Sequence, residues 1–173
     1  MKVFRPAAVL LGIGSLVVGI SMVVHGGSAA AGALGEEQVP AAARQQLAAA
    51  RNATARYHDV ELAIADGYVL ASPNIPGEGF HYVNRNLIDC NFEPERPEVL
   101  LYVPSGNGLR LVGAEYSIPI ACSPTAPPEG FAGDADEWEF MAEGRPIWAR
   151  VAWLWLGNPN GIFAEPPHPL LIK

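Results

Sequence analysis

Two residues of the sequence have side chains suited to acid–base or metal chemistry, His81 and Glu115. His81 lies between a glycine-rich turn and a predicted strand, in Gly79-Phe80-His81-Tyr82-Val83-Asn84. An imidazole ionises near neutral pH and also ligates metals, so a histidine at a pocket mouth is a candidate binding group. The alternative is a half-buried histidine bonded to a backbone carbonyl or a carboxylate, which is the commoner situation.

Glu115 belongs to a strand predicted over residues 109–119. Alternation along that strand places Leu109, Leu111, Gly113 and Glu115 on one face. If the leucines face the core, Glu115 does too, and its carboxylate must be paired, metal-bound or protonated. The alternative is an exposed or arginine-paired carboxylate at the strand end, with Arg150 as the predicted partner.

His81 and Glu115 together could begin a metal site, because histidine with a carboxylate suits zinc, iron or manganese. The sequence offers no third ligand at a recognisable spacing, since His58 and His168 do not converge with the pair. Neither His-x-His nor the metalloprotease pattern occurs, and the nucleophile elbow of hydrolases is absent. We therefore predict no cofactor and assign no catalytic residue, and a metal-dependent enzyme using His81 and Glu115 is the alternative function.

Aromatic side chains in the same β-rich segments favour a ligand cavity over a catalytic centre. Trp153 and Trp155 would alternate onto one face next to the turn at residues 158–161. An ordinary sheet core explains most of the other aromatic residues. The predicted function is non-catalytic binding of a small apolar or aromatic ligand. The predicted pocket is framed by His81, Tyr82, Asn84, Glu115 and Trp153.

The elements that would position these residues form an α+β fold. Residues 36–66 carry apolar side chains at three- and four-residue steps and predict one long amphipathic helix, which Gly67 ends. Short strands follow, and the Ser105–Gly108 turn predicts a hairpin between residues 98–104 and 109–119, with a further β-rich segment at 147–156. We expect the helix to pack on an antiparallel sheet or a small open barrel.

The N-terminal residues have the layout of a secretory signal. Lys2 and Arg5 precede an uncharged apolar run, residues 7–24, and small residues follow it. We predict a signal peptide over residues 1–33 and a single exported domain over 34–173, periplasmic or extracellular. An uncleaved membrane anchor through residues 7–24 is the alternative. In an oxidising compartment Cys90 and Cys122 are expected to form a disulfide.

The charge of the exported part limits its partners. Nine basic and 18 acidic residues lie beyond the signal, a formal net charge of −9. Such a surface repels nucleic acids and anionic lipid headgroups. Neither is expected as a partner, and the oligomeric state is left open. A self-assembling cell-envelope protein is the second alternative, and it predicts a large exposed apolar patch.

The order of several blocks resembles a family of small exported bacterial proteins of unassigned function. The blocks are Ala55–Val60 with Ala65–Tyr68, Gly79–Asn84, Pro97–Tyr102, Leu111–Tyr116 and Trp153–Phe163. The resemblance implies no activity. Members of that family often have a histidine two residues before the first tryptophan of the last block, where this chain has Val151. If the family uses that histidine together with the one at position 81, this chain has lost half of the pair.

Overall fold

A computed structural model describes residues 39–142 and 145–172 of the chain. The predicted signal peptide at 1–33 and helix residues 36–38 lie outside the described residues. Within the described part, no helix is long and apolar enough to cross a membrane. The anchor alternative, which rests on residues 7–24, is therefore neither supported nor opposed.

The predicted long helix is wrong as a continuous element. The chain forms α1 (Ala41–Thr54), a 3₁₀ turn η2 (Ala55–His58) and a short helix α2 (Val60–Ala65). Asp59 makes the break, because its backbone is extended and its carboxylate accepts a hydrogen bond from Glu61 N at 3.0 Å, which caps α2. The break also shifts the buried stripe, so Ile64 is 45% exposed and Ala63 is buried instead.

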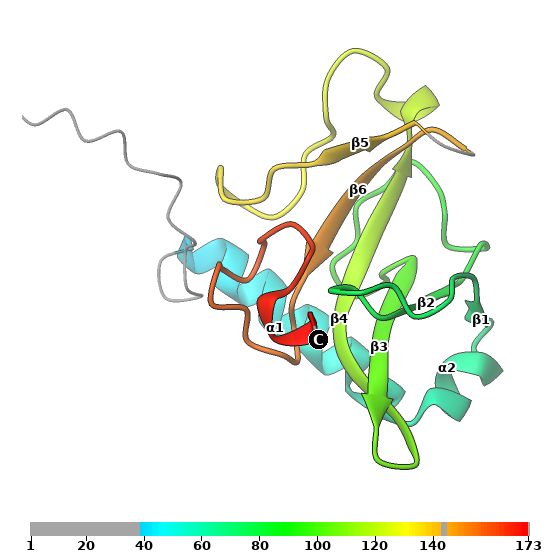
Figure 1. Ribbon diagram of the computed structural model, residues 1–173. Coiled ribbons are helices and arrows are strands. Elements are labelled where there is room, and N and C mark those ends of the chain that lie inside the picture. The colour runs from blue at the N-terminus through cyan, green and yellow to red at the C-terminus, as the bar shows by residue number, and fades with distance from the viewer. Residues whose placement is uncertain (1–38, 143–144, 173) are drawn as a thin grey trace, which may run out of the picture. The chain divides into compact units, whose positions relative to one another are not determined.

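Six antiparallel strands form one open sheet in the order β1-β2-β3-β4-β6-β5 (Figure 1). The strands are β1 (Val69–Leu70), β2 (Phe80–Val83), β3 (Val99–Ser105), β4 (Gly108–Pro119), β5 (Glu139–Met141) and β6 (Ile147–Ala152). The α+β class is confirmed, and so is the β3–β4 hairpin. No barrel forms among the described strands, because β1 and β5 end the sheet at opposite edges.

The two faces of this sheet are covered by different parts of the chain. Helix α1 crosses one face, which we call the helix-covered face (Figure 1). The side chains buried on it include Leu100, Tyr102, Leu111, Ala114 and Tyr116. The opposite face, which we call the His81 face, buries Val99, Leu101, Val112, Val151 and Trp153. The C-terminal 3₁₀ turn η4 (Pro169–Leu171) contributes Leu171 to this second cluster.

The two cysteines form the predicted disulfide. The Cα atoms of Cys90 and Cys122 lie 5.4 Å apart, and the described chain contains no free cysteine. The bond ties the loop between β2 and β3 to the 3₁₀ turn η3 (Ile120–Cys122), which directly follows β4. A structural disulfide of this kind fits an oxidising environment.

Candidate functional site

A tight turn before β2 positions His81. The turn closes through a hydrogen bond from Ile75 N to Gly79 O at 2.9 Å. Gly79 has φ +96°, and a Cβ added there would lie 2.2 Å from Tyr102 O, so only glycine lets the chain pass β3 this closely. His81 then pairs with Leu101 of β3, which places its side chain on the His81 face.

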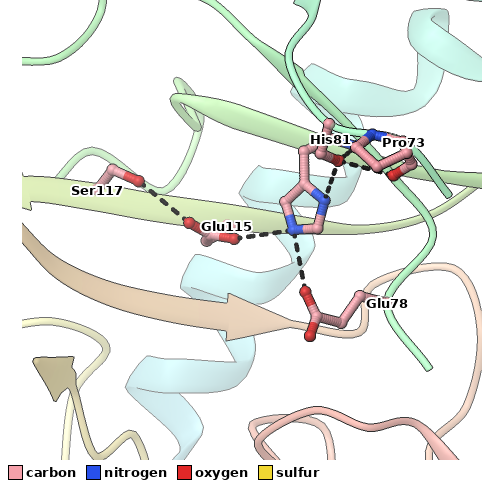
Figure 2. A network of polar contacts seen from close by, with 6 residues as sticks. Pro73, Glu78, His81, Glu115 and Ser117 are labelled. Carbon is pink, nitrogen blue, oxygen red and sulfur yellow. Dashed lines mark hydrogen bonds and ion pairs between the residues drawn. The ribbon is translucent and has the colours of Figure 1, made fainter. Parts of the chain in front are cut away.

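Two carboxylates approach the outer nitrogen of the imidazole. Glu78 Oε2 lies 3.4 Å and Glu115 Oε2 3.5 Å from His81 Nε2 (Figure 2). Glu78 comes from the turn and Glu115 from β4, so the imidazole links the turn to the centre of the sheet. Only 15% of the His81 side chain and 11% of the Glu115 side chain are exposed, so water screens this contact weakly.

The other ring nitrogen meets a hydroxyl. Ser72 Oγ lies 2.9 Å from His81 Nδ1, accepts a hydrogen bond from His81 N at 3.1 Å and lies 3.0 Å from Pro73 O. When the hydroxyl proton points at Pro73 O, Nδ1 must carry a proton, and the ring is an imidazolium if Nε2 is protonated as well. When it points at Nδ1, the ring is neutral and its Nε2–H faces the glutamates. Both protonation states therefore keep the same heavy-atom arrangement.

The carboxylates favour the charged ring. Burial by itself lowers the pKa of His81, but the hydrogen bond to Glu115 and the charges of Glu115 and Glu78 outweigh it, so the pKa lies above the ordinary 6.5. Burial raises the pKa of Glu78 above its ordinary 4.5, with the positive His81 opposing that rise. His81 and Glu78 therefore both hold their protons to a higher pH than in water.

Glu115 reaches this site for a different reason from the predicted one. A bulge in the β3–β4 pairing places Leu101 opposite Gly113 but Tyr102 opposite Leu111. The extra residue, Val112, reverses the alternation, so Leu111 packs on the helix-covered face while Glu115 lies on the His81 face. The predicted shared face of Leu111 and Glu115 is wrong.

Arg150 is not the partner of Glu115. Its Cα pairs with Tyr116, and its Nη1 donates to Glu165 Oε1 at 2.6 Å. Because neighbouring residues of a strand point to opposite faces, Arg150 and Val151 diverge, and only Val151 shares a face with Glu115. The predicted Glu115–Arg150 pair is therefore wrong, and Glu115 pairs with His81 instead.

The other predicted pocket residues do not converge with His81 and Glu115. Tyr82 packs against Tyr102 on the helix-covered face, with ring centroids 5.1 Å apart. Asn84 is buried, and its Nδ2 donates to Asp66 O at 2.9 Å, near the end of α2. Trp153 is 2% exposed, and its Nε1 donates to Ala164 O. The five residues therefore do not line one pocket, although His81 and Glu115 do meet.

Trp153 and Trp155 also lie apart. Strand β6 ends at Ala152, so strand alternation does not extend to the two tryptophans. Trp153 packs with the buried cluster of the His81 face, while Trp155 Nε1 donates to Thr54 Oγ1 of α1 at 3.2 Å. Their predicted shared face is wrong for that reason.

Val151 is the Cα partner of Glu115, and it is buried on the same face. The position at which the resembling family often has histidine is therefore directly across from the Glu115 carboxylate. A histidine pair there stays a prediction from the resemblance. Among residues 39–142 and 145–172, no group of three or more His, Cys, Asp and Glu side chains is arranged to hold a metal ion.

A cavity of about 340 Å³ opens beside the turn that carries Glu78. Its walls come from the turn, from the end of β3 and from η4. The lining residues are Asn74, Ile75, Pro76, Gly79, Val103, Pro104, Leu170 and Leu171. A second hollow, of about 720 Å³, is lined by one stretch of chain, residues 127–138. The first is the better candidate because three separate segments build it, one of them the turn that carries Glu78.

Ser72 and Glu78 were not predicted from the sequence. The one available signal for Glu78 was its place between two glycines, three residues before His81, where a turn brings the two side chains together. Ser72 lies nine residues before His81 and carries no motif. Comparison of the chain with protein families, curated proteins and solved structures found no match.

Proposed function

We propose that the protein binds a small, mainly apolar molecule in the cavity between the 74–79 turn, β3 and η4. The observation that carries this proposal is the cavity itself, about 340 Å³ with walls of Ile75, Val103, Leu170 and Leu171. Binding pockets for small molecules start near this size and are mostly apolar. The protein would bind this ligand in the periplasm or outside the cell, in keeping with the disulfide and the predicted signal peptide.

Contacts behind the walls support a cavity that exists before the ligand arrives. His168 N donates to Gly77 O at 2.8 Å, which joins the turn to the C-terminal segment. Gly77 packs so closely that a Cβ there would lie 2.2 Å from Pro167 Cβ. On its other side, Glu78 is paired with His81. A wall held from both sides loses little entropy when a ligand binds.

The lining suggests the chemistry of the ligand. Asn74 supplies a polar side chain, and the described lining residues include no charged one. Burying a charged group against these walls would cost free energy without compensation. We therefore expect a neutral ligand with an aromatic or short aliphatic body and at most one hydrogen-bonding group near Asn74.

Fluorescence of the neutral dye N-phenyl-1-naphthylamine tests the proposal on protein produced from the full-length gene. Leu170 lines the cavity and is 61% exposed, so Leu170→Asp should leave the fold intact and raise the Kd for the dye about tenfold. The matched control is Leu70→Asp on edge strand β1, where Leu70 is 55% exposed and outside the cavity. No fluorescence gain, or equal Kd values for the two variants, would contradict the proposal.

Native mass spectrometry of the same preparation addresses the other two functions predicted from the sequence. A stoichiometric metal mass that disappears in His81→Ala would favour the metal-dependent enzyme. A discrete oligomer would favour self-assembly through the edge strands. Those edges carry exposed apolar side chains at Val69, Leu70, Phe140 and Met141.

A further inference from the structure

The geometry points to a nucleophilic relay, Ser72–His81–Glu115, that would hydrolyse small esters bound in the neighbouring cavity. This inference goes beyond ligand binding, and it rests on the proposed function for the place where the substrate sits. Three groups from three separate segments meet in it: a hydroxyl that precedes the turn, an imidazole in β2 and a carboxylate in β4. Figure 2 shows the imidazole of His81 directed at Glu115. A hydroxyl and a carboxylate on opposite nitrogens of one histidine make the arrangement that activates a serine nucleophile.

The distances fit this order of roles. Ser72 Oγ is 2.9 Å from His81 Nδ1, within reach for direct proton transfer. Glu115 Oε2 lies 3.5 Å from His81 Nε2 on the far side of the ring, and Glu78 Oε2 lies 3.4 Å from the same atom. Glu115 is also oriented, because its Oε1 accepts from Ser117 Oγ at 3.3 Å. Ser72 is the nucleophile, His81 the base, and Glu115 a positioning residue.

The neutral ring is the reactive state. With Nε2–H directed at Glu115, Nδ1 accepts the Ser72 hydroxyl proton, and a lone pair on Oγ is left to attack. With the imidazolium, Nδ1–H donates to Oγ, and the hydroxyl proton turns to Pro73 O, so the base is occupied. Among residues 39–142 and 145–172, the side chains that face this ring are Ser72 from the segment before the turn, Glu78 from the turn and Glu115 from β4, and the Gly79 backbone also bonds to it.

The cavity supplies the place for an ester. Asn74 is one of its lining residues and lies two positions after Ser72. Gly79, another lining residue, lies two positions before His81, and Val103 belongs to the same face as His81. A short acyl chain held against Ile75 and Val103 would therefore be bound by the segment that follows Ser72 and by the face that carries His81.

The reaction would proceed in two balanced steps. Ser72 Oγ attacks the ester carbonyl carbon as its proton passes to His81 Nδ1, and the ester C–O bond breaks as that proton passes to the leaving alcohol. Water then attacks the acyl-Ser72 carbonyl and gives a proton to Nδ1, which returns it to Ser72 Oγ as the carboxylic acid leaves. No oxidant, reductant or metal is needed.

A fluorophosphonate probe and p-nitrophenyl butyrate test the relay on protein from the full-length gene. We expect one phosphonyl group on Ser72, located by peptide mass spectrometry, and butyrate hydrolysis at least about 100-fold weaker in Ser72→Ala. Ser105→Ala is the control, because Ser105 is an exposed hairpin serine. Hydrolysis should rise with pH as His81 loses its proton, and Glu115→Gln should move the midpoint of that rise to lower pH.

The outcomes separate this inference from the proposed function. Dye binding without phosphonylation would overturn the relay and leave ligand binding standing. Phosphonylation or hydrolysis that is equal in Ser72→Ala would also overturn it. If Glu115→Gln lowers the rate but leaves the midpoint in place, Glu115 has a structural role only, and its assignment as positioning residue is wrong.

Discussion

The polar side chains on the two faces of the sheet have different kinds of hydrogen-bond partner. On the helix-covered face, three tyrosine hydroxyls donate hydrogen bonds to backbone carbonyls. These bonds run from Tyr68 to Pro97, from Tyr102 to Tyr57 and from Tyr116 to Pro94, at 2.7, 2.7 and 2.8 Å. On the His81 face, Ser72, Glu78, His81 and Glu115 bond mainly to each other. A hydroxyl bonded to a carbonyl fixes the fold, whereas a chain of side chains can pass a proton.

Ionisation sharpens the contrast. Burial raises the pKa of all three tyrosines well above 10, so these hydroxyls stay uncharged over the physiological pH range. On the His81 face, the pKa of His81 is raised above 6.5 and that of Glu78 above 4.5, so both groups release their protons at higher pH than usual. A protein selected for stability alone gains little from such titration, since the same positions could hold apolar side chains. This difference is the reason for placing function on the His81 face.

The largest expected effect separates stability from function. Leu47→Ala removes a fully buried side chain of α1 from the helix-covered face and should lower the free energy of unfolding by about 2 to 5 kcal/mol. The dye affinity and phosphonylation of the folded protein should not change. Urea unfolding measures the loss, with Leu62→Ala as control because Leu62 is 39% exposed. A loss below about 1 kcal/mol, or a changed dye affinity, would contradict the division of roles.

The part of the fold that follows from local chemistry was predictable from the sequence. Asn107-Gly108 marks the β3–β4 hairpin, Cys90 and Cys122 pair, and His81 and Val83 share a face as alternation requires. The break at Asp59 was not predicted, because the apolar period continues through it and only the capping carboxylate interrupts it.

The site was predictable only in part. His81 and Glu115 were selected correctly as neighbours, but Glu115 lies beside His81 because of the bulge at Val112. The available signal for that bulge was Gly113, because a glycine inside a strand often marks a bulge, and the alternation argument did not use it. Tyr82 and Asn84 were assigned to the pocket because they lie near His81 in the sequence. Tyr82 directly follows His81 in β2, however, and adjacent residues of a strand point to opposite faces of the sheet. Ser72 is brought to His81 only by the folding of the chain, and no sequence motif marks it.

The second prediction concerns the pH dependence of the free energy of unfolding, which is set by the groups that titrate. Burial raises the pKa of the Glu98 carboxyl from 4.5 to about 7. The folded state therefore binds this proton more tightly than the unfolded chain, and the free energy of unfolding should fall as pH rises from 4.5 to 7, by up to about 3 kcal/mol. His81 acts with the same sign, since its ion pairs stabilise below pH 6.5 and are lost as pH rises through its raised pKa.

Glu98→Gln isolates the first of these contributions. The amide oxygen can still accept the hydrogen bond from Ser117 N, which Glu98 Oε2 accepts at 2.9 Å, but the group no longer titrates. Urea unfolding at pH 5, 6, 7 and 8 should show a flatter decline in the variant than in the unchanged protein. An identical slope would mean that Glu98 titrates near its ordinary value, and that the burial argument for it is wrong.

The smallest effect tests whether the tyrosine hydroxyls of the helix-covered face are purely structural. Tyr102→Phe leaves the ring in the core but removes the donor to Tyr57 O, so the free energy of unfolding should fall by about 1 kcal/mol. Tyr82→Phe is the matched control, because no described residue hydrogen-bonds its hydroxyl, and it should change stability by less than about 0.5 kcal/mol. Neither variant should alter dye binding or the pH dependence of hydrolysis. A change in either would show that contacts on the helix-covered face affect His81. Strand β2 is the route for such an effect, because Tyr82 and His81 are adjacent in it. The two faces would then form one functional unit.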